Sequence, residues 1–573
     1  MTDRTNGKDD ALEASVILYR QGKLSRRKFI RMAVSAGVTA GVAGALAHAW
    51  SPEALAASTI TTPKPARTFD YIVIGSGSAG SAAAGRLAST SDASVLLLEA
   101  GGEDDLPEVH DPKLWAASLG TRATKFFNTV PQRHADGRAH AWPRGNVLGG
   151  TSALNAMIFA RGHRSDYDSW AYAGNTGWSY DEVLPHFKAM ETWEGGASTF
   201  RGDQGPIFIS TPAADKRHEG AQAFMDACAS LGFKETPDIN AERMSGQAWV
   251  NFNIKDFKRQ SSATAFLRPA MAGKNLTVLT DAPAIKLVID KGRCKGVTYL
   301  HNGKAHTLYA DREVILSAGA IDSPRLLMLS GVGPAADLAR VGIDAVVDLP
   351  VGQGLQDHIL GAGVNYEATG PVPLSHYNHS EVYMWERSDS RLPAPDAIAL
   401  YVSVPFASTG HQLNYEHGYC ILSGVARPHS RGHVALASSD PAVPPIVDPN
   451  YLAEEQDWKA YRFATELCRE IGADQAYAPF RKAEVLPGGG ELSDGQWREF
   501  LAKSLNTYFH PTSTCRMGVG EDAVVDPELR VYGIENLRVA DASIMPAITT
   551  SNTNAPAMMI GWRCAEMLRA AAA

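Results

Sequence analysis

A short apolar run followed by a glycine-rich turn occupies residues 69–80, with the sequence FDYIVIGSGSAG. The apolar part, residues 69–74, is typical of a buried parallel strand. Glycine recurs at Gly75, Gly77 and Gly80, as it must where φ is unusual, where a phosphate approaches the backbone, or where a helix packs closely on a strand. Small residues in helical spacing follow. The start of such a helix offers free N–H groups and a positive dipole end to a pyrophosphate.

A second apolar strand is predicted at residues 94–98, directly before Glu99. A carboxylate at this place can hold the hydroxyls of a ribose. The order of strand, glycine turn, helix, second strand and acid therefore predicts a dinucleotide-binding α/β unit. These residues fit NAD and FAD equally, and the alternative is a glycine-rich turn that binds no nucleotide.

The composition of the 573-residue chain is that of a globular protein with a substantial core. With 45% hydrophobic and 20% charged residues, it excludes a collagen-like, disordered or polytopic membrane protein. The net charge of −8 gives no reason to expect a nucleic-acid partner. The six cysteines have no close pair, which argues against a zinc site, an iron–sulfur cluster, a c-type haem or a disulfide scaffold. We therefore expect no metal site.

The first 57 residues have the features of a twin-arginine export signal. Arg26 and Arg27 precede an apolar segment rich in alanine and glycine at residues 32–49, and a small-residue stretch ends it at residues 54–56. The apolar segment is too weak for a membrane span. We expect a periplasmic or otherwise exported protein; an N-terminal anchor or a chance basic run is the alternative.

Two longer motifs distinguish between the cofactors. Residues 145–155 read GNVLGGTSALN, and residues 319–333 read GAIDSPRLLMLSGVG. Both resemble the two signatures of the glucose–methanol–choline (GMC) flavoprotein oxidoreductases, and the resemblance extends from Phe69 to the C-terminal helix. It implies FAD as the cofactor.

The resemblance also assigns cofactor positions one by one. The ADP half of FAD is expected at Gly75, Gly77, Ser78, Ala79, Gly80, Glu99 and Ala100, and the adenine at the backbone of Ala284. The pyrophosphate and isoalloxazine are expected along Val147, Thr151 and Asn155, and the ribityl–phosphate region at Asp541 and Ala542. Some relatives bond the flavin covalently through a histidine in the first signature. Leu154 occupies that position here, so the resemblance implies noncovalent FAD.

Two further stretches resemble the catalytic motifs of the family. Residues 508–518, YFHPTSTCRMG, supply His510, and residues 551–556, SNTNAP, precede an apolar helix whose leading residue is Asn554. The resemblance implies that His510 accepts the hydroxyl proton of an alcohol while hydride leaves for flavin N5. Asn554 is expected to hydrogen-bond the alkoxide oxygen or His510, and the helix start to face the flavin edge where negative charge develops.

The order of the motifs predicts two interleaved domains. A Rossmann-like FAD domain with a parallel sheet is expected from residues 68–170, 276–335 and 525–573. Residues 171–275 and 336–524 should form an α+β substrate domain with an antiparallel sheet, which covers the open face of the flavin. The cofactor motifs leave the identity of the alcohol open, because the variable cap shapes the pocket.

The function expected from these features is that of an exported FAD-dependent alcohol dehydrogenase. The alternatives are an alcohol oxidase that produces H2O2, a flavin-containing hydroxynitrile lyase and a non-catalytic flavin-binding protein. The electron acceptor would be a quinone, a cytochrome c or O2. Since the chain has no haem motif and no convincing span, membrane contact is expected only through a partner.

Overall fold

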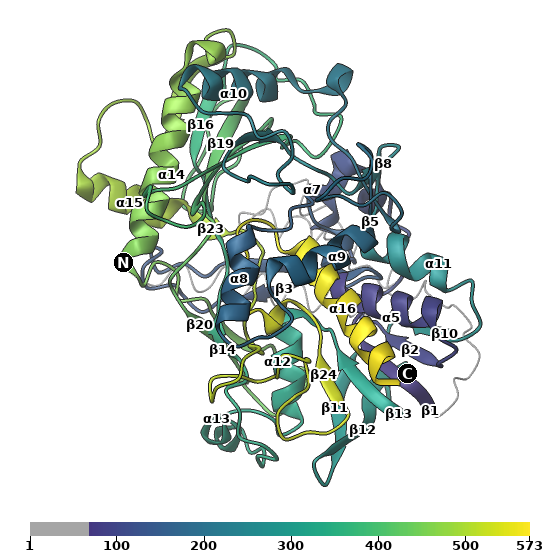
Figure 1. Cartoon of the computed structure of the whole chain (residues 1–573). Coiled ribbons are helices and arrows are strands. Elements are labelled where there is room, and N and C mark those ends of the chain that lie inside the picture. The colour runs from purple at the N-terminus through teal and green to yellow at the C-terminus, as the bar shows by residue number, and fades with distance from the viewer. Residues whose placement is uncertain (1–67, 573) are drawn as a thin grey trace, which may run out of the picture.

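A computed structural model describes residues 68–572, which form two sheets with helices packed on them (Figure 1). The predicted export signal at residues 1–57 lies outside the described residues. Between residues 68 and 572, no helix is both long and apolar enough to cross a membrane.

The first sheet has seven strands and a parallel core. In spatial order they are β10 (Leu276–Leu279), β2 (Val95–Leu98), β1 (Thr68–Ile74), β13 (Lys304–Leu316), β12 (Arg293–His301) and β11 (Ala284–Asp290), and β24 (Leu537–Val539) also pairs with β13. The pairs β10–β2, β2–β1, β1–β13 and β13–β24 are parallel, whereas β11, β12 and β13 form an antiparallel extension. The Rossmann-like α/β class predicted from the sequence is confirmed.

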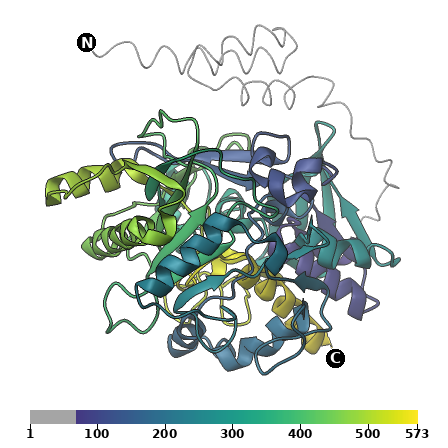
Figure 2. The same cartoon turned by 90° about the horizontal axis from the view of Figure 1, so that it is seen from above.

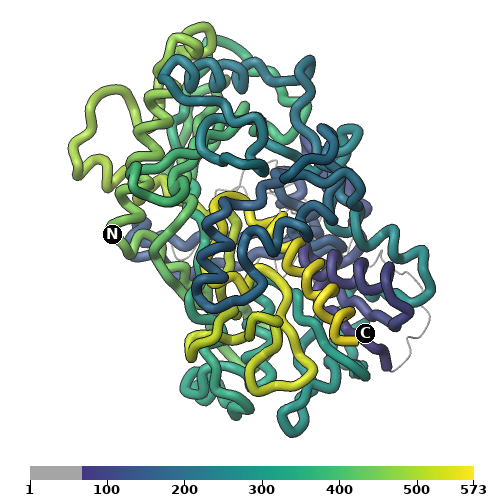
Figure 3. The backbone as a smooth tube through the Cα atoms, viewed as in Figure 1, coloured from purple at the N-terminus to yellow at the C-terminus, as the bar shows by residue number. Residues whose placement is uncertain are grey.

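Two helices pack closely beside this parallel core. Helix α5 (Ser78–Thr90) follows the glycine turn, and the C-terminal helix α16 (Asn554–Ala572) lies against it, as the yellow and purple segments of Figure 3 show. A Cβ at Gly561 of α16 would lie only 2.0 Å from the carbonyl oxygen of Ala79. The ends of the described chain are thus joined through a contact that requires glycine.

The second sheet has eight strands and is antiparallel. Its main path runs β22 (Arg481–Leu486), β16 (Val364–Ala368), β19 (Gly418–Val425), β18 (Ala397–Val402), β17 (Val382–Glu386) and β7 (Gly246–Trp249), while β15 (Ile359–Gly361) pairs with β19 and with β23 (Leu505–Thr507). Helices α10 (Glu219–Ser230) and α14 (Glu455–Ala473) pack on it. Figure 2 shows α14 on the opposite side of the molecule from α5.

Both faces of the second sheet are buried, and its side chains alternate between two cores. Tyr401 and Tyr419 share one core with α10 and α14. Leu400, next to Tyr401, and Leu422, three positions after Tyr419, belong to the other core, on the opposite face. This alternation, expected of a strand with period two, turns an apolar set of side chains away from the covering helices.

The two sheets take their strands from alternating parts of the chain. Those of the first sheet lie within residues 68–170, 276–335 and 525–573, and those of the second within 171–275 and 336–524. The domain boundaries themselves stay predictions.

Shorter elements connect and flank the two sheets. The helical ones are α6 (Pro107–His110), η1 (Pro112–Leu114), α7 (Trp115–Ser118), η2 (Gly150–Ala153), α8 (Arg164–Tyr172), α9 (Tyr180–Met190), η3 (Ala214–Lys216), η4 (Ala263–Leu267), α11 (Arg268–Ala270), α12 (Gly319–Leu329), α13 (Ala335–Arg340), η5 (Gln475–Tyr477), α15 (Asp494–Ser504) and η6 (Ala542–Ile544). The strands are β3 (Thr124–Asn128), β4 (Ala141–Gly145), β5 (Glu191–Trp193), β6 (Ile207–Ile209), β8 (Ile254–Lys255), β9 (Lys258–Arg259), β14 (Gln353–Leu355), β20 (Gly432–Ala435) and β21 (Ile446–Asp448).

Candidate active site

A cavity of about 520 Å³ extends from the glycine turn of the first sheet to the second sheet. Its walls include Gly75 and Gly77 after β1, and Leu400 and Leu422 of the second sheet. A volume in this range is typical of small-molecule and cofactor sites.

The glycine turn is shaped by close backbone contacts. Gly75 has a φ of +96°, and a Cβ there would lie 2.5 Å from the carbonyl oxygen of Ser317. Gly150 has a φ of +53°, and its Cβ would lie 2.6 Å from the Cα of Gly77. A Cβ at Gly77 itself would meet no protein atom within 4 Å. Gly77 therefore leaves the cavity open at the place where a pyrophosphate needs to approach the backbone.

Glu99 lies at the end of β2 and is buried. One carboxylate oxygen accepts hydrogen bonds from the backbone N–H (2.9 Å) and hydroxyl (2.5 Å) of Ser76, and the other accepts from the N–H of Gly101 (2.8 Å). Burial raises the pKa of Glu99, and these hydrogen bonds oppose the rise. The carboxylate fixes the glycine turn and also lines the cavity, where its remaining lone pairs are available to a ribose.

Most of the predicted cofactor residues line this one cavity. They are Gly75, Gly77, Ser78, Ala79, Glu99, Ala100, Thr151, Asn155, Ala284, Asp541 and Ala542.

Gly80 and Val147 are not among the lining residues. A Cβ at Gly80 would lie 1.9 Å from the carbonyl oxygen of Gly75, so this glycine closes the turn. The side chain of Val147 is buried in a small apolar cluster with Val109 and Leu154. Both residues support the cavity wall through packing and do not face the cavity. A local sequence motif does not show whether a residue faces the cavity or packs behind its wall.

The residues present fit an FAD molecule, and one buried polar atom supports this. Asn554 lines the cavity; its Oδ1 accepts a hydrogen bond from the hydroxyl of Ser78 (2.7 Å), but its Nδ2 is buried without a partner. A buried donor left unsatisfied costs free energy, so a ligand that accepts from it is favoured there. Asn554 begins α16 and Ser78 begins α5, and two helix starts facing one cavity favour an anionic group.

His510 follows β23 and borders the cavity with two polar neighbours. Its Nδ1 lies 2.9 Å from the Nδ1 of His358, and its Nε2 lies 3.3 Å from the Nδ2 of Asn552. Because Asn552 Nδ2 donates, His510 Nε2 acts as the acceptor, and the proton of the neutral ring is on Nδ1, where it is donated to His358. Nε2 is therefore unprotonated, and its lone pair can take up a proton when a hydroxyl replaces Asn552 as its partner.

The surroundings of His510 favour its neutral form. Removal from water lowers its pKa well below the usual value of 6.5, and His358 and the positive charge of Arg144 lower it further. Burial likewise lowers the pKa of His358 to about 3. Two neutral imidazoles can share the single proton between their Nδ1 atoms, whereas two charged ones would repel each other.

A buried carboxylate holds the backbone at His510. Asp357 accepts hydrogen bonds from the backbone N–H of His510 (2.7 Å), from the hydroxyl of Thr507 (2.6 Å) and from that of Tyr451. Burial raises the pKa of Asp357 to about 6, against the effect of these hydrogen bonds and of nearby Arg144.

The residue before His510 has a strained backbone. Phe509 has a φ of +64°, in the left-handed region that a bulky residue rarely adopts. Its N–H donates to the hydroxyl of Thr507 (2.7 Å), and both terminal nitrogens of Arg144 donate to its carbonyl oxygen (3.0 Å each). Strain that is maintained by specific contacts is common where a side chain must be aimed at a site.

Asn552, and not Asn554, is the asparagine that contacts His510. Asn554 lies two residues further on and bonds Ser78 at the glycine turn instead. The predicted contact between Asn554 and His510 is therefore corrected to Asn552, while the predicted helix start at Asn554 is present. Both asparagines line the cavity, and the first of them is the neighbour of His510.

Sequence reasoning also missed His358 and Asp357. They follow Gln356 in a polar triplet just before the buried strand β15. A run of three polar, chemically versatile side chains at the entry to an apolar strand is a signal that could have identified them.

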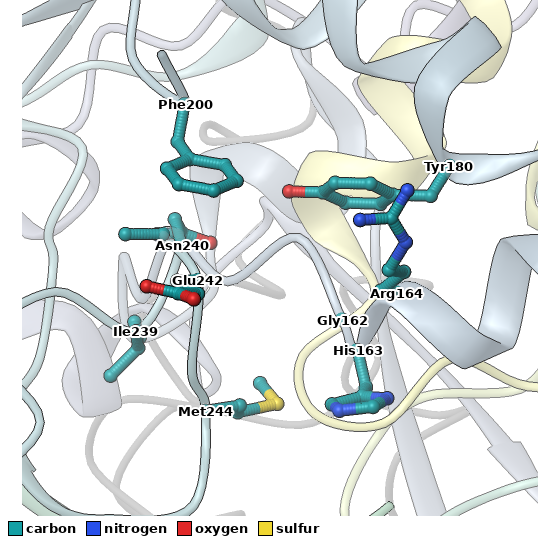
Figure 4. Close-up of a pocket in the computed structure, with 10 residues that line it drawn as sticks. Gly162, His163, Arg164, Tyr180, Phe200, Ile239, Asn240, Glu242 and Met244 are labelled. Atoms are coloured by element: carbon teal, nitrogen blue, oxygen red, sulfur yellow. The ribbon is translucent and has the colours of Figure 1, made fainter. Parts of the chain in front are cut away.

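The cysteines and a second, small cavity offer no other chemistry. All six cysteines are buried and free. A cavity of about 50 Å³ lies among Gly162, His163, Tyr180, Asn240 and Met244 (Figure 4), with room for one or two water molecules only. Within residues 68–572, no group of three or more histidines, cysteines or acids is placed to hold a metal.

Comparison with known proteins agrees with this site. Two sequence profiles, both described as GMC oxidoreductase, match residues 69–360 and 428–561. The chain is 38% identical over 535 residues to human mitochondrial choline dehydrogenase, a match that spans 87% of this chain and 90% of the relative. It is 38% identical over 524 residues to the oxygen-dependent choline dehydrogenase of Brucella suis biovar 1, spanning 87% and 95%.

Solved structures show the same fold. Pyridoxine 4-oxidase from Mesorbium loti superposes with a TM-score of 0.85 at 37% identity, covering 88% of this chain and 99% of that one. Formate oxidase of Aspergillus oryzae superposes with a TM-score of 0.82 at 27% identity, covering 89% and 99%. With profile matches along most of its length and relatives above 30% identity, this chain belongs to the GMC oxidoreductase family.

Proposed function

We propose that this protein oxidises the CH–OH group of an alcohol to a carbonyl, with FAD as cofactor and His510 as general base. The observation that carries the proposal is the pair formed by His510 Nε2 and Asn552 Nδ2, 3.3 Å apart at the wall of the cavity. Choline and pyridoxine, the compounds in the names of two relatives, are both primary alcohols.

The protein groups act on the proton and the oxygen. His510 accepts the hydroxyl proton at Nε2, and Asn552 donates a hydrogen bond to the oxygen as negative charge develops on it. His358 keeps the His510 proton on Nδ1, and Asp357 and Arg144 hold the N–H and the carbonyl of the peptide group between Phe509 and His510. FAD, when bound, supplies the acceptor for the hydride that leaves the carbon.

Anaerobic mixing of the FAD-loaded protein with a panel of primary and secondary alcohols tests the proposal. Loss of the oxidised flavin absorbance at about 450 nm is expected with at least one of them, because the substrate's electrons remain on the cofactor. A hydroxynitrile lyase would cleave its substrate without net reduction of the flavin. A non-catalytic flavin-binding protein would leave both substrate and flavin unchanged, and either result would refute the oxidation.

The FAD is expected to be bound noncovalently. Leu154 has no nucleophilic atom, is buried and borders the cavity, at the position where a histidine forms the covalent bond in some relatives. Acid or heat denaturation of the yellow holoprotein should therefore release free FAD into the filtrate. Flavin that stays with the precipitated chain would disprove this prediction.

The pH profile should reflect the lowered pKa of His510. The base acts when neutral, so activity is present above its pKa and lost as the pH falls through it. Because the pKa of His510 is well below 6.5, kcat/KM should stay flat on acidification past 6.5 and fall only at lower pH. An acid limb centred at or above 6.5 would contradict the expected lowering.

Asp357 is a second buried group that could produce an acid limb, since its pKa is about 6. The Asp357→Asn variant shows which of the two residues, His510 or Asp357, causes the acid limb. Its side chain keeps an acceptor for the His510 N–H but cannot titrate. A limb that persists in this variant belongs to His510, and a limb that disappears belongs to Asp357.

The proposed role is that of an exported dehydrogenase, supported by Arg26 and Arg27 in the signal-like segment. Outside the cytoplasm no NAD pool is available, so a quinone or a cytochrome c would take the electrons, and O2 is the alternative acceptor.

Rapid mixing of the reduced enzyme with air-saturated buffer distinguishes a dehydrogenase from an oxidase. Reoxidation at the rate of turnover, with stoichiometric H2O2, would make the protein an oxidase, and cell fractionation tests the export.

A further inference from the structure

We infer that the site accepts a neutral alcohol with a hydrocarbon body and discriminates against a quaternary ammonium alcohol such as choline. The inference rests on the proposed function and specifies the substrate class. It is carried by the chemistry of the cavity wall that the second sheet provides.

The substrate side of the cavity is apolar. Leu360 of β15, Leu400 and Val402 of β18, and Leu422 of β19 line it, together with Phe406 and Tyr383. These strand residues lie on the face of the second sheet that is turned away from helices α10 and α14. The same apolar side chains therefore pack in the core of the second sheet and line the cavity. Such a surface binds hydrocarbon by excluding water.

Several polar groups of this wall are bonded to other protein groups, whereas the buried hydroxyl of Ser380 lines the cavity without a partner. The Tyr508 hydroxyl donates to that of Tyr383 at 3.1 Å. The amide of Asn378 donates to the carbonyl oxygen of Ala156 and accepts from the N–H of Ser380. The Ser380 hydroxyl can hydrogen-bond a neutral group but carries no charge, and His510 and Asn552 are placed to bind one hydroxyl.

His379 also borders this wall and brings no charge. Its Nδ1 lies 3.1 Å from the hydroxyl of Ser403 and its Nε2 lies 3.3 Å from the carbonyl oxygen of Lys113. Burial lowers the pKa of His379, so the ring is neutral at neutral pH. The second sheet thus contributes no ionised side chain to the described lining of the cavity.

None of the carboxylates among the described lining residues lies on the second sheet. They are Glu99, Asp322 and Asp541. Glu99 is bonded to Ser76 and Gly101, and Asp541 to Gly319, Ser323 and Ser543.

Asp322, the third carboxylate, is neutralised by two cations. Lys125 Nζ lies 3.3 Å from one of its oxygens, and Arg325 Nη1 lies 3.0 Å from the other. Both cations line the cavity as well. A quaternary ammonium group would therefore find the charge of Asp322 already paired with two cations.

A permanent cation would have to leave water for this wall without a counter-charge. The rings of Tyr383, Phe406 and Tyr508 could attract it through their faces, but the attraction of aromatic faces is smaller than the desolvation penalty of an unpaired ion. A neutral group of the same shape has no such penalty and gains from burial. The expected preference therefore follows from charge alone.

Choline and 3,3-dimethylbutan-1-ol test this directly, because they differ only in a central nitrogen cation or carbon atom. With the FAD-loaded enzyme and a dye acceptor, kcat/KM should be at least about 100-fold higher for the neutral alcohol. Equal values, or a preference for choline, would overturn the inference. If no alcohol of the wider panel reduces the flavin, the proposed function fails instead, and the two failures are thereby distinguished.

Inhibition measurements compare the binding of choline and of 3,3-dimethylbutan-1-ol if the enzyme oxidises both compounds slowly. Each is then measured as an inhibitor of the fastest alcohol in the panel, and tighter inhibition by the neutral compound is expected. Inhibition by choline that is as strong or stronger would refute the inference.

Val402 offers a matched pair of variants. The side chain is half-buried and lines the cavity at the end of β18. Val402→Asp should shift the ratio of the two kcat/KM values toward choline by about tenfold, as expected for a new close charge pair. Val402→Asn, of the same shape without the charge, should leave the ratio within about threefold on the same grounds. The flavin spectrum of each variant verifies that it folds, and the same shift in both would attribute the effect to shape.

Discussion

Replacing His510 with alanine is expected to lower the rate of alcohol oxidation by about 10²–10⁴-fold, the range for loss of a general base. His510 supplies the one imidazole nitrogen that faces Asn552 at the cavity wall, and its partners keep that nitrogen unprotonated. The FAD should remain bound, because the predicted nucleotide contacts lie at Gly75, Gly77 and Glu99. Single-turnover reduction of the flavin, monitored by absorbance, measures the effect without interference from the electron acceptor.

His306→Ala serves as the control for this experiment. His306 is exposed on β13 and does not line the cavity, so its variant should reduce the flavin at the wild-type rate. A His510→Ala rate within a few-fold of the wild type would assign the base to another group.

The second large effect is expected at Asn552. Removing a donor aimed at a developing oxyanion costs about 10²–10³-fold in kcat, and Asn552→Ala should behave in this way while FAD stays bound. The loss should not add to that of His510→Ala, since both groups act on the same oxygen and its proton.

Asn554→Ala is the matched comparison, two residues further on at the first position of α16. Because the buried Nδ2 of Asn554 has no protein partner and its Oδ1 bonds Ser78, this variant should mainly weaken FAD binding. A loss of about 1–2 kcal/mol, or roughly tenfold in Kd, is expected from the removal of one hydrogen-bonding group. Flavin fluorescence titration of the apoprotein measures it. If Asn554→Ala abolishes flavin reduction and Asn552→Ala does not, the roles given to the two residues are reversed.

The nucleotide-binding part of the fold could be predicted because its determinants are local. A buried strand, a glycine turn, a helix and a second strand ending in Glu99 follow one another within about thirty residues, as in other units of this kind. The structure has β1, α5 and β2 in that order, and the predicted glycine and acid positions line one cavity except where Gly80 supports the turn. Steric limits on the turn act within a few residues, so a sequence pattern describes them fully.

The candidate catalytic site was only half predictable, because its residues come from distant parts of the chain. His510 was found through its motif, but His358 reaches it from 152 positions earlier, and only the packing of β15 against β23 brings them together. The choice between Asn552 and Asn554 depends on the loop before α16. That loop contains Ser551 with a φ of +105°, which changes the direction of the chain directly before Asn552.

Contacts from elsewhere in the fold hold this loop. Asp166 accepts hydrogen bonds from the N–H (2.7 Å) and hydroxyl (3.0 Å) of Thr550, and Gln356 accepts one from the N–H of Ile548 (3.1 Å). The sequence by itself determined the α/β nucleotide unit and the family resemblance, and it singled out His510 as the candidate base. Only the tertiary structure decided which asparagine faces that base and how apolar the substrate wall is, because both depend on side chains brought together from segments hundreds of residues apart.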